Sequence, residues 1–216
     1  MNTTVLVFDL DGTLIDSRKD IAVAVNHSLV QVGLAPLSES VIASYVGDGA
    51  LALLQRATGL AANEPQLLTA HTEFRQYYTR HAAVYTQVYA GVRDTLTSLQ
   101  QRYTLALCTN KPRETTDQVL QDLDLAKFFK SIVAADDLPE KKPHPAPLLR
   151  IAKHLGVNPS VMAMIGDGPQ DINCGHAAGT LCVGVTFGIK SRAEMLAANP
   201  HHVVDRFDDL LRLFAL

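Results

Sequence analysis

The stretch from Val5 to Asp16, VLVFDLDGTLID, constrains the fold of this 216-residue chain more than any other segment does. Its first four residues, Val5 to Phe8, are apolar and predict a strand buried on both faces, as in parallel sheets covered by helices. Asp9 and Asp11 follow at the C-terminal end of this strand, where open α/β sheets bind their ligands. Because residues i and i+2 of an extended segment share a face, both carboxylates are expected to converge on one site.

These two carboxylates need a partner if they do converge. Two anions about 4 Å apart repel by roughly 4 kcal/mol at an effective dielectric constant near 20. A cation or a shared proton must therefore compensate them. The alternative interpretation is that D-x-D-G serves only as a turn and helix cap.

The composition is that of an ordinary soluble globular protein, and it narrows the possible partners. The hydrophobic content of 47% is ample for a core, and a net charge of -3 argues against a nucleic-acid or anionic-membrane surface. No basic leader segment or membrane-spanning apolar stretch is visible, so we expect a cytoplasmic protein. The three cysteines have no C-x-x-C spacing, which predicts neither a disulfide framework nor a zinc site.

A long helical block follows Asp16. Ser17 is predicted to cap its first helix, which ends at Gly33, and further helices are predicted over residues 38–45, 50–57 and 65–80. No strand is predicted between residues 16 and 89. Because an ordinary β-to-α crossover is far shorter, we expect residues 16–89 to form an inserted helical cap on a catalytic core of residues 1–15 and 90–216.

Strands and helices alternate in the remainder of the chain. Predicted strands cover residues 104–108, 132–134, 161–165, 181–183 and 203–204, and predicted helices cover 91–101, 113–121, 145–154, 169–178 and 207–214. This alternation predicts a doubly wound parallel sheet. The expected fold is thus an α/β, Rossmann-like core with a small inserted helical cap.

Polar residues cluster where these strands end or where the following helices begin. They are Asp9, Asp11, Thr109, Asn110, Lys142, Asp167 and Asp171. The loops that carry them open at one edge of a parallel sheet, so segments remote in sequence can meet there. Since the set is too acidic to stand alone, we expect a cation, and oxygen ligands favour Mg²⁺ over metals that prefer thiolate or imidazole.

A site with Mg²⁺ and a lysine suits a phosphoryl group, so the expected partner is a small phosphorylated metabolite. Asp9 is the candidate nucleophile and would form an aspartyl-phosphate. Asp11 is the candidate general acid, which would protonate the leaving oxygen and later take a proton from the attacking water. Thr109 with Asn110, and Lys142, would hold the phosphoryl oxygens.

The motifs DLDGT (9–13), TN (109–110), KPHP (142–145) and GDGPQD (166–171) together resemble the four motifs of the haloacid dehalogenase-like phosphatases. The helical block is similar to the small cap of that superfamily. This resemblance implies Asp9 as nucleophile, Asp11 as general acid and base, and Mg²⁺ bound by Asp9, Asp167 and the backbone carbonyl of Asp11. Within the superfamily, VGDGA (46–50), TNKP (109–112) and KKPHPAPLL (141–149) are most similar to phosphoglycolate phosphatases.

That resemblance predicts how a substrate carboxylate is received. The cap loop with Gly47 and Gly49 can approach the substrate closely and present backbone N–H groups at a helix N-terminus. Arg18, Lys19 and Arg56 are the cations nearest to it in sequence.

The fourth motif departs from the family pattern. Gly168 stands where the family often has Ser or Thr, and Pro169-Gln170 replaces a common polar-Asn pair. Contacts around the metal site are therefore expected to differ.

Other interpretations of the same residues are open at this point. Thr109 could only cap the next helix, Lys142 could be a solvated loop charge, and Asp171 could be a first-turn acid favoured by the helix dipole. Gly47 and Gly49 could form no more than a turn. Among functions, a sugar phosphomutase would share the aspartyl-phosphate, and a receiver-type phospho-accepting module would gather similar residues without a cap.

Overall fold

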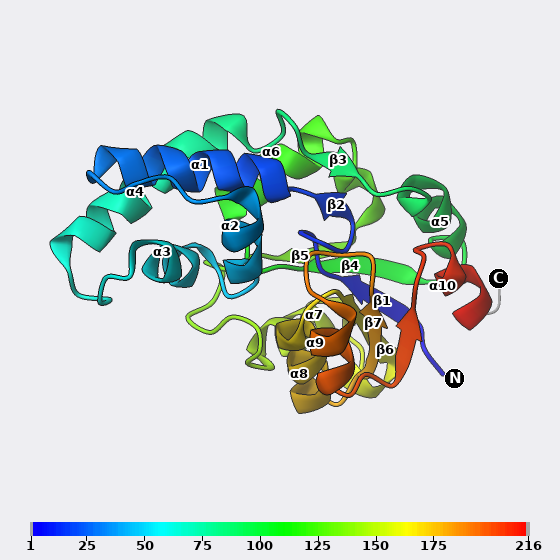
Figure 1. Cartoon of the computed structure of the whole chain (residues 1–216). Coiled ribbons are helices and arrows are strands. Elements are labelled where there is room, and N and C mark those ends of the chain that lie inside the picture. The colour runs from blue at the N-terminus through cyan, green and yellow to red at the C-terminus, as the bar shows by residue number, and fades with distance from the viewer. Residues whose placement is uncertain (1, 215–216) are drawn as a thin grey trace.

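The computed structural model describes residues 2–214, and its main element is one six-stranded parallel sheet (Figure 1). The strand order β5-β4-β1-β6-β7-β8 places the first strand at the centre, between two strands that are remote in sequence. The strands are β1 (Val5–Phe8), β4 (Thr104–Cys108), β5 (Ser131–Val133), β6 (Met162–Gly166), β7 (Leu181–Val185) and β8 (His202–Val204). The predicted doubly wound parallel sheet is confirmed.

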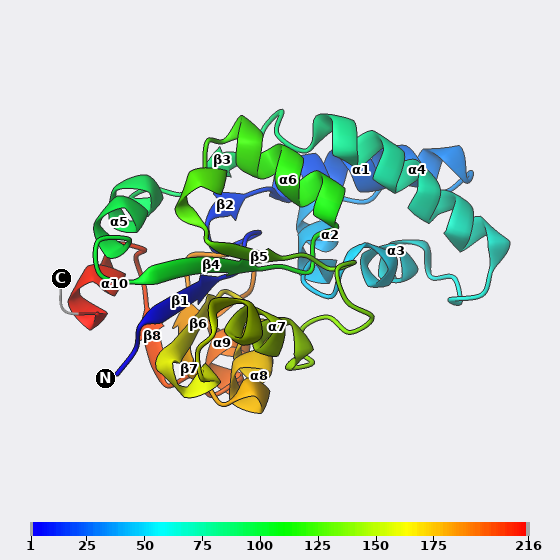
Figure 2. The ribbon, with the colours of Figure 1, turned by 180° about the vertical axis from the view of Figure 1, so that it is seen from behind.

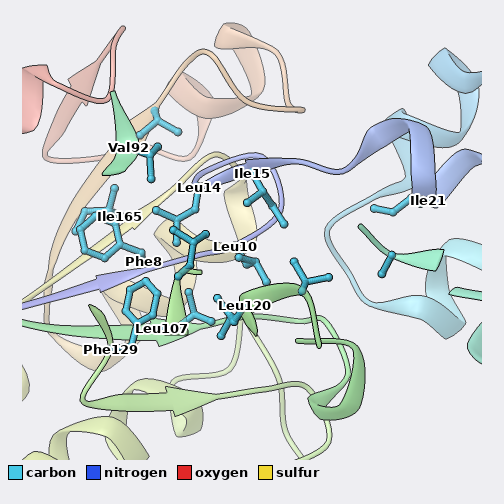
Figure 3. Packing of buried hydrophobic residues seen from close by; sticks show 14 of the residues in the cluster. Phe8, Leu10, Leu14, Ile15, Ile21, Val92, Leu107, Leu120, Phe129 and Ile165 are labelled. Carbon is cyan, nitrogen blue, oxygen red and sulfur yellow. The ribbon is translucent and has the colours of Figure 1, made fainter. Parts of the chain in front are cut away.

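Helices cover both faces of this sheet, as the apolar pattern of β1 requires. Leu6 and Phe8 point to one face, whereas Val5 and Val7 belong to a separate buried cluster on the other. Figure 3 shows Phe8 packed near Leu107 and Ile165 on the first face. The core helices are α5 (Val92–Leu99), α6 (Arg113–Asp122), α7 (Ala146–Leu155), α8 (Pro169–Ala178), α9 (Arg192–Ala197) and α10 (Asp209–Leu213), with short 3₁₀ turns at Ala126–Phe128 and Pro159–Val161.

Four helices between the first strand and the rest of the sheet form a separate layer (Figures 1 and 2). They are α1 (Arg18–Gln31), α2 (Glu39–Tyr45), α3 (Ala50–Thr58) and α4 (Pro65–His81). Both views show α1 and α4 side by side. None of the helices within residues 2–214 has the length and apolar character needed to cross a membrane.

A two-stranded antiparallel ribbon joins this helical layer to the sheet. Strand β2 (Ile15–Asp16) pairs with β3 (Gln87–Val88), so the prediction of no strand between residues 16 and 89 is wrong. Such two-residue strands have no readable periodicity, because they exist only where two distant segments meet. Asp20 ties the same segments together, since its carboxylate accepts hydrogen bonds from the backbone N–H groups of Tyr85 and Thr86.

Candidate active site

Three buried acids meet at the C-terminal edge of the sheet. Asp9 follows β1 and Asp167 follows the neighbouring strand β6, while Asp171 lies in the first turn of α8. One carboxylate oxygen of each lies within 4.8 Å of the others. Gly12 makes room for this arrangement, because it adopts φ +86° and a Cβ there would lie 2.2 Å from Asp167 Oδ2.

Lys142 lies among these acids and is 1% exposed. Its ammonium donates to Asp9 Oδ1 at 2.6 Å, to Asp171 Oδ1 at 2.6 Å and to the carbonyl oxygen of Cys108 at 2.7 Å. All three of its donors are thereby used. The interpretation of Lys142 as a solvated loop charge is therefore wrong. Asp171 is more than a first-turn acid favoured by the helix dipole, because it also accepts a hydrogen bond from Lys142.

The protonation of the acids reflects their burial. Removal from water raises the pKa of Asp9 to about 8; Lys142 opposes this rise, and Asp171 and Asp167 add to it by repulsion. Burial, with repulsion from Asp171, also raises the pKa of Asp167 to about 7, although the N–H groups of Ile189 and Lys190 oppose the change. One lysine thus does not neutralise the cluster.

The donor set fits a divalent cation such as Mg²⁺. Asp9 Oδ1 is engaged by Lys142 and Asp167 Oδ2 by the N–H groups of Ile189 and Lys190. The second oxygen of each carboxylate accepts no hydrogen bond within residues 2–214. Two unshared carboxylate oxygens, which belong to buried residues directly after adjacent strands, are the hard ligands that Mg²⁺ prefers.

The raised pKa values of these acids predict an unusual pH dependence of the stability of the metal-free protein. Asp9 and Asp167 have folded-state pKa values above the ordinary carboxyl value, so between about pH 4 and 8 the folded state holds more protons than the unfolded state. Their stabilising contribution is present below the ordinary pKa and is lost as pH rises through about 7 to 8. We expect the free energy of unfolding in chelator to fall by at least about 2 kcal/mol between about pH 5.5 and 8.5.

Urea unfolding at both pH values, with chelator and with excess Mg²⁺, checks this expectation. Mg²⁺ should remove most of the decline because it binds the ionised carboxylates. The variant Asp167→Asn should show a shallower decline in chelator. Stability that stays level or rises with pH in chelator would contradict the proposed electrostatics.

Asp11 has a separate set of partners that the sequence did not predict. Lys111 donates to both of its carboxylate oxygens, at 2.8 and 2.9 Å, and to the hydroxyl of Tyr78 at 2.7 Å. Ser17 donates to Asp11 Oδ1 at 2.6 Å; although it stands at the N-cap of α1, its side chain makes no capping hydrogen bond. Lys111 is the lysine of TNKP, so the motif contained the signal.

Thr109 and Asn110 lie at the end of β4, and both line the same pocket as Asp9 and Asp11. The side-chain amide of Asn110 donates to the carbonyl oxygens of Gly47 and Lys142, both at 2.9 Å. Its oxygen accepts from the backbone N–H of Lys142 at 3.0 Å. Asn110 thus links the core to the cap loop, and the N-cap of α6 is Pro112 rather than Thr109.

The cap loop forms the opposite wall of this pocket. Gly47 and Gly49 line it with φ values of +130° and +86°, and α3 begins directly after Gly49. Lys141 donates to the carbonyl oxygen of Asp48 and holds the loop from the core side.

The three cations nearest to this loop in sequence do not line the pocket. Arg18 pairs with Asp16, and Arg56 pairs with Asp48. The ammonium of Lys19 lies over the ring of Tyr85. Arg56 thus contacts the loop itself, whereas Arg18 is held by Asp16 and Lys19 by an aromatic ring.

The sequence of this chain is similar to those of one family of known proteins. Residues 6–185 match the model of the haloacid dehalogenase-like hydrolases. The phosphoglycolate phosphatase of Haemophilus influenzae is 34% identical over 99% of this chain and 100% of its own length. That of Pseudomonas putida is 37% identical over 95% of this chain and 78% of its own length.

A solved structure has the same fold over nearly the whole chain. It is that of a predicted phosphoglycolate phosphatase from Haemophilus somnus, with a TM-score of 0.92, 31% identity and 99% coverage of both chains. The chain therefore belongs to the haloacid dehalogenase-like hydrolase family, as an enzyme of its phosphatase class.

Proposed function

We propose that this phosphatase hydrolyses 2-phosphoglycolate in a Mg²⁺-dependent reaction through an aspartyl-phosphate on Asp9. The observation that carries the proposal is the buried Asp9, which keeps one carboxylate oxygen free at the strand end while Lys142 holds the other. The substrate is suggested by relatives with the name phosphoglycolate phosphatase.

Mg²⁺, held by Asp9, Asp167 and the backbone carbonyl of Asp11, would supply positive charge against the phosphoryl oxygens. The free Asp9 oxygen would bond to phosphorus as the ester P–O bond breaks, while protonated Asp11 gives its proton to the departing oxygen. Water would then attack the acyl-phosphate and give a proton back to Asp11. Phosphate would leave, and the Asp9 carboxylate would be restored.

Three side chains would position these two acids. Lys142 would orient Asp9 and, since its three donors are already used, would act on the phosphoryl group through its charge, while Thr109 would donate to a phosphoryl oxygen. The contact of Lys142 with Asp171 keeps it in place. Lys111 and Ser17 would hold Asp11 toward the pocket from two sides. The contact of Lys111 with Tyr78, on α4, would make the position of Asp11 depend on a closed cap.

The division into a core of residues 1–15 and 90–216 and a cap of residues 16–89 belongs to this proposal. The paired β2 and β3 would serve as the joint between the two parts. Gly47 and Gly49 would present backbone N–H groups to the end of the substrate that is remote from phosphorus. A cytoplasmic location and the absence of a nucleic-acid partner remain predictions.

Phosphate release from 2-phosphoglycolate, hexose phosphates and nucleotides tests the proposal. We expect 2-phosphoglycolate to have the highest kcat/KM, with activity dependent on Mg²⁺ and lost in chelator. Ca²⁺ should inhibit, because it takes more ligands at longer distances and disturbs the in-line geometry of attack. Full activity after dialysis against chelator would refute metal dependence, and a higher rank for hexose phosphates or nucleotides would refute the substrate.

A further inference from the structure

Gln170 carries an unpaired amide in the pocket. It lies in the first turn of α8, lines the pocket and is 8% exposed. No residue between 2 and 214 makes a hydrogen bond with its side chain. Neither polar atom of this side chain is fully enclosed by protein, so the amide reaches the open space of the pocket and can bond to a ligand there.

The position of this amide depends on two glycines. A Cβ at Gly168 would lie 2.2 Å from Gln170 Nε2, and one at Gly47 would lie 2.9 Å from the same atom. The amide therefore occupies a gap between the core turn and the cap loop. Gly168 and Gln170 both depart from the family pattern, and a side chain at position 168 would collide with the amide of Gln170.

The other pocket amide provides a contrast. Asn110 has its nitrogen and its oxygen engaged by Gly47 and Lys142. It holds the cap loop on the core and has an internal partner for each group. Gln170 is thus the amide of the described pocket that remains available to a ligand.

We infer that Gln170 is a specificity-determining residue whose amide bonds to the end of the substrate remote from phosphorus. The inference rests on the proposed function, since the phosphoryl group then lies at Asp9 and the rest of the substrate extends toward the cap loop that Gln170 touches. An amide offers both a donor and an acceptor. For 2-phosphoglycolate the partner is a carboxylate, so Nε2–H donates to it.

The test compares 2-phosphoglycolate with 2-hydroxyethyl phosphate, which has a neutral alcohol in place of the carboxylate. Gln170→Met keeps the length of the side chain and removes its polar groups. We expect its kcat/KM for 2-phosphoglycolate to fall about 10- to 100-fold, the usual effect of losing a hydrogen bond to a charged group. The loss with 2-hydroxyethyl phosphate should be at least about tenfold smaller.

Two further variants check the chemistry and the position. Gln170→Glu keeps the shape but repels an anion, so it should shift the ratio of kcat/KM values further toward the neutral ester. Gly168→Ala should shift the ratio in the same direction, because its Cβ displaces the amide without altering it. Gln66→Met, which removes an exposed amide bonded to the carbonyl of Val32, is the control and should leave the ratio unchanged.

The outcomes separate this inference from the proposed function. If the wild-type protein releases phosphate from neither ester, the proposed function fails. If it prefers 2-phosphoglycolate but Gln170→Met lowers kcat/KM equally for both esters, only the inference is overturned. Thermal melts identify variants that fail to fold. If Gln170→Met fails to fold, Gly168→Ala replaces it in the comparison of the two esters.

Discussion

Replacing Asp9 by asparagine should lower kcat for phosphate release by at least about a thousandfold. The amide is nearly isosteric with the carboxylate, but it is a poor nucleophile and cannot form the acyl-phosphate. Its oxygen can still accept the hydrogen bond that Lys142 donates to Asp9 Oδ1 at 2.6 Å. The structure around the site should therefore persist while turnover is lost.

Stability provides a second readout for Asp9→Asn. Burial raises the pKa of Asp9 to about 8, so its ionised form destabilises the metal-free protein near neutral pH. Removing the ionisable group should make the metal-free variant at least as stable as the wild type at about pH 8. Asp117→Asn, at an exposed position of α6, is the control and should alter neither activity nor stability. Asp9→Asn activity within about tenfold of wild type would refute the nucleophile assignment.

Lys142→Met should remove activity and also destabilise the fold, by about 3–5 kcal/mol near neutral pH. The ammonium contacts Asp9 and Asp171, which are both buried, so its removal leaves two buried carboxyl groups without their shared donor. A lower pH should restore part of the stability, because a carboxyl group whose folded-state pKa is raised stabilises the fold while it is protonated. Urea unfolding at several pH values measures the effect.

Two comparisons define the cause of that loss. Lys153→Met, at an exposed position of α7, should change the free energy of unfolding by less than about 1 kcal/mol. Adding Asp171→Asn to Lys142→Met should recover part of the stability, because the buried carboxyl group that has lost its lysine partner is removed. A double variant less stable than Lys142→Met alone would show that packing, and not charge, explains the effect.

The contacts of Lys111 connect the end of the central strand to the helical layer. Lys111 joins Asp11, which follows the central strand, to Tyr78 on α4. Burial, opposed by attraction from Lys111, raises the pKa of the Tyr78 hydroxyl, so this hydroxyl remains protonated at physiological pH. Tyr78 therefore bonds to Lys111 as a neutral group, and the ammonium remains the charge partner of Asp11.

Much of the core was predictable because its signals are local. Val5–Phe8 is apolar at every position and is buried on both faces, as a central parallel strand requires. The acids at its end, and those after β6, then had to lie at one edge of the sheet, because parallel strands end together. For the same reason Asp9, Asp167 and Asp171 could be predicted as one cluster without coordinates.

What the sequence alone determined is therefore the sheet, its helices and the set of acids at its edge, all of which follow from periodicity and strand order. The tertiary structure decided the partners: Lys142 between Asp9 and Asp171, Lys111 on Asp11, the β2–β3 ribbon, and the free amide of Gln170. Each of these depends on contact between segments that are far apart in the chain or on the space that a missing Cβ leaves. Such contacts have no periodicity in sequence, because side-chain packing in three dimensions selects them.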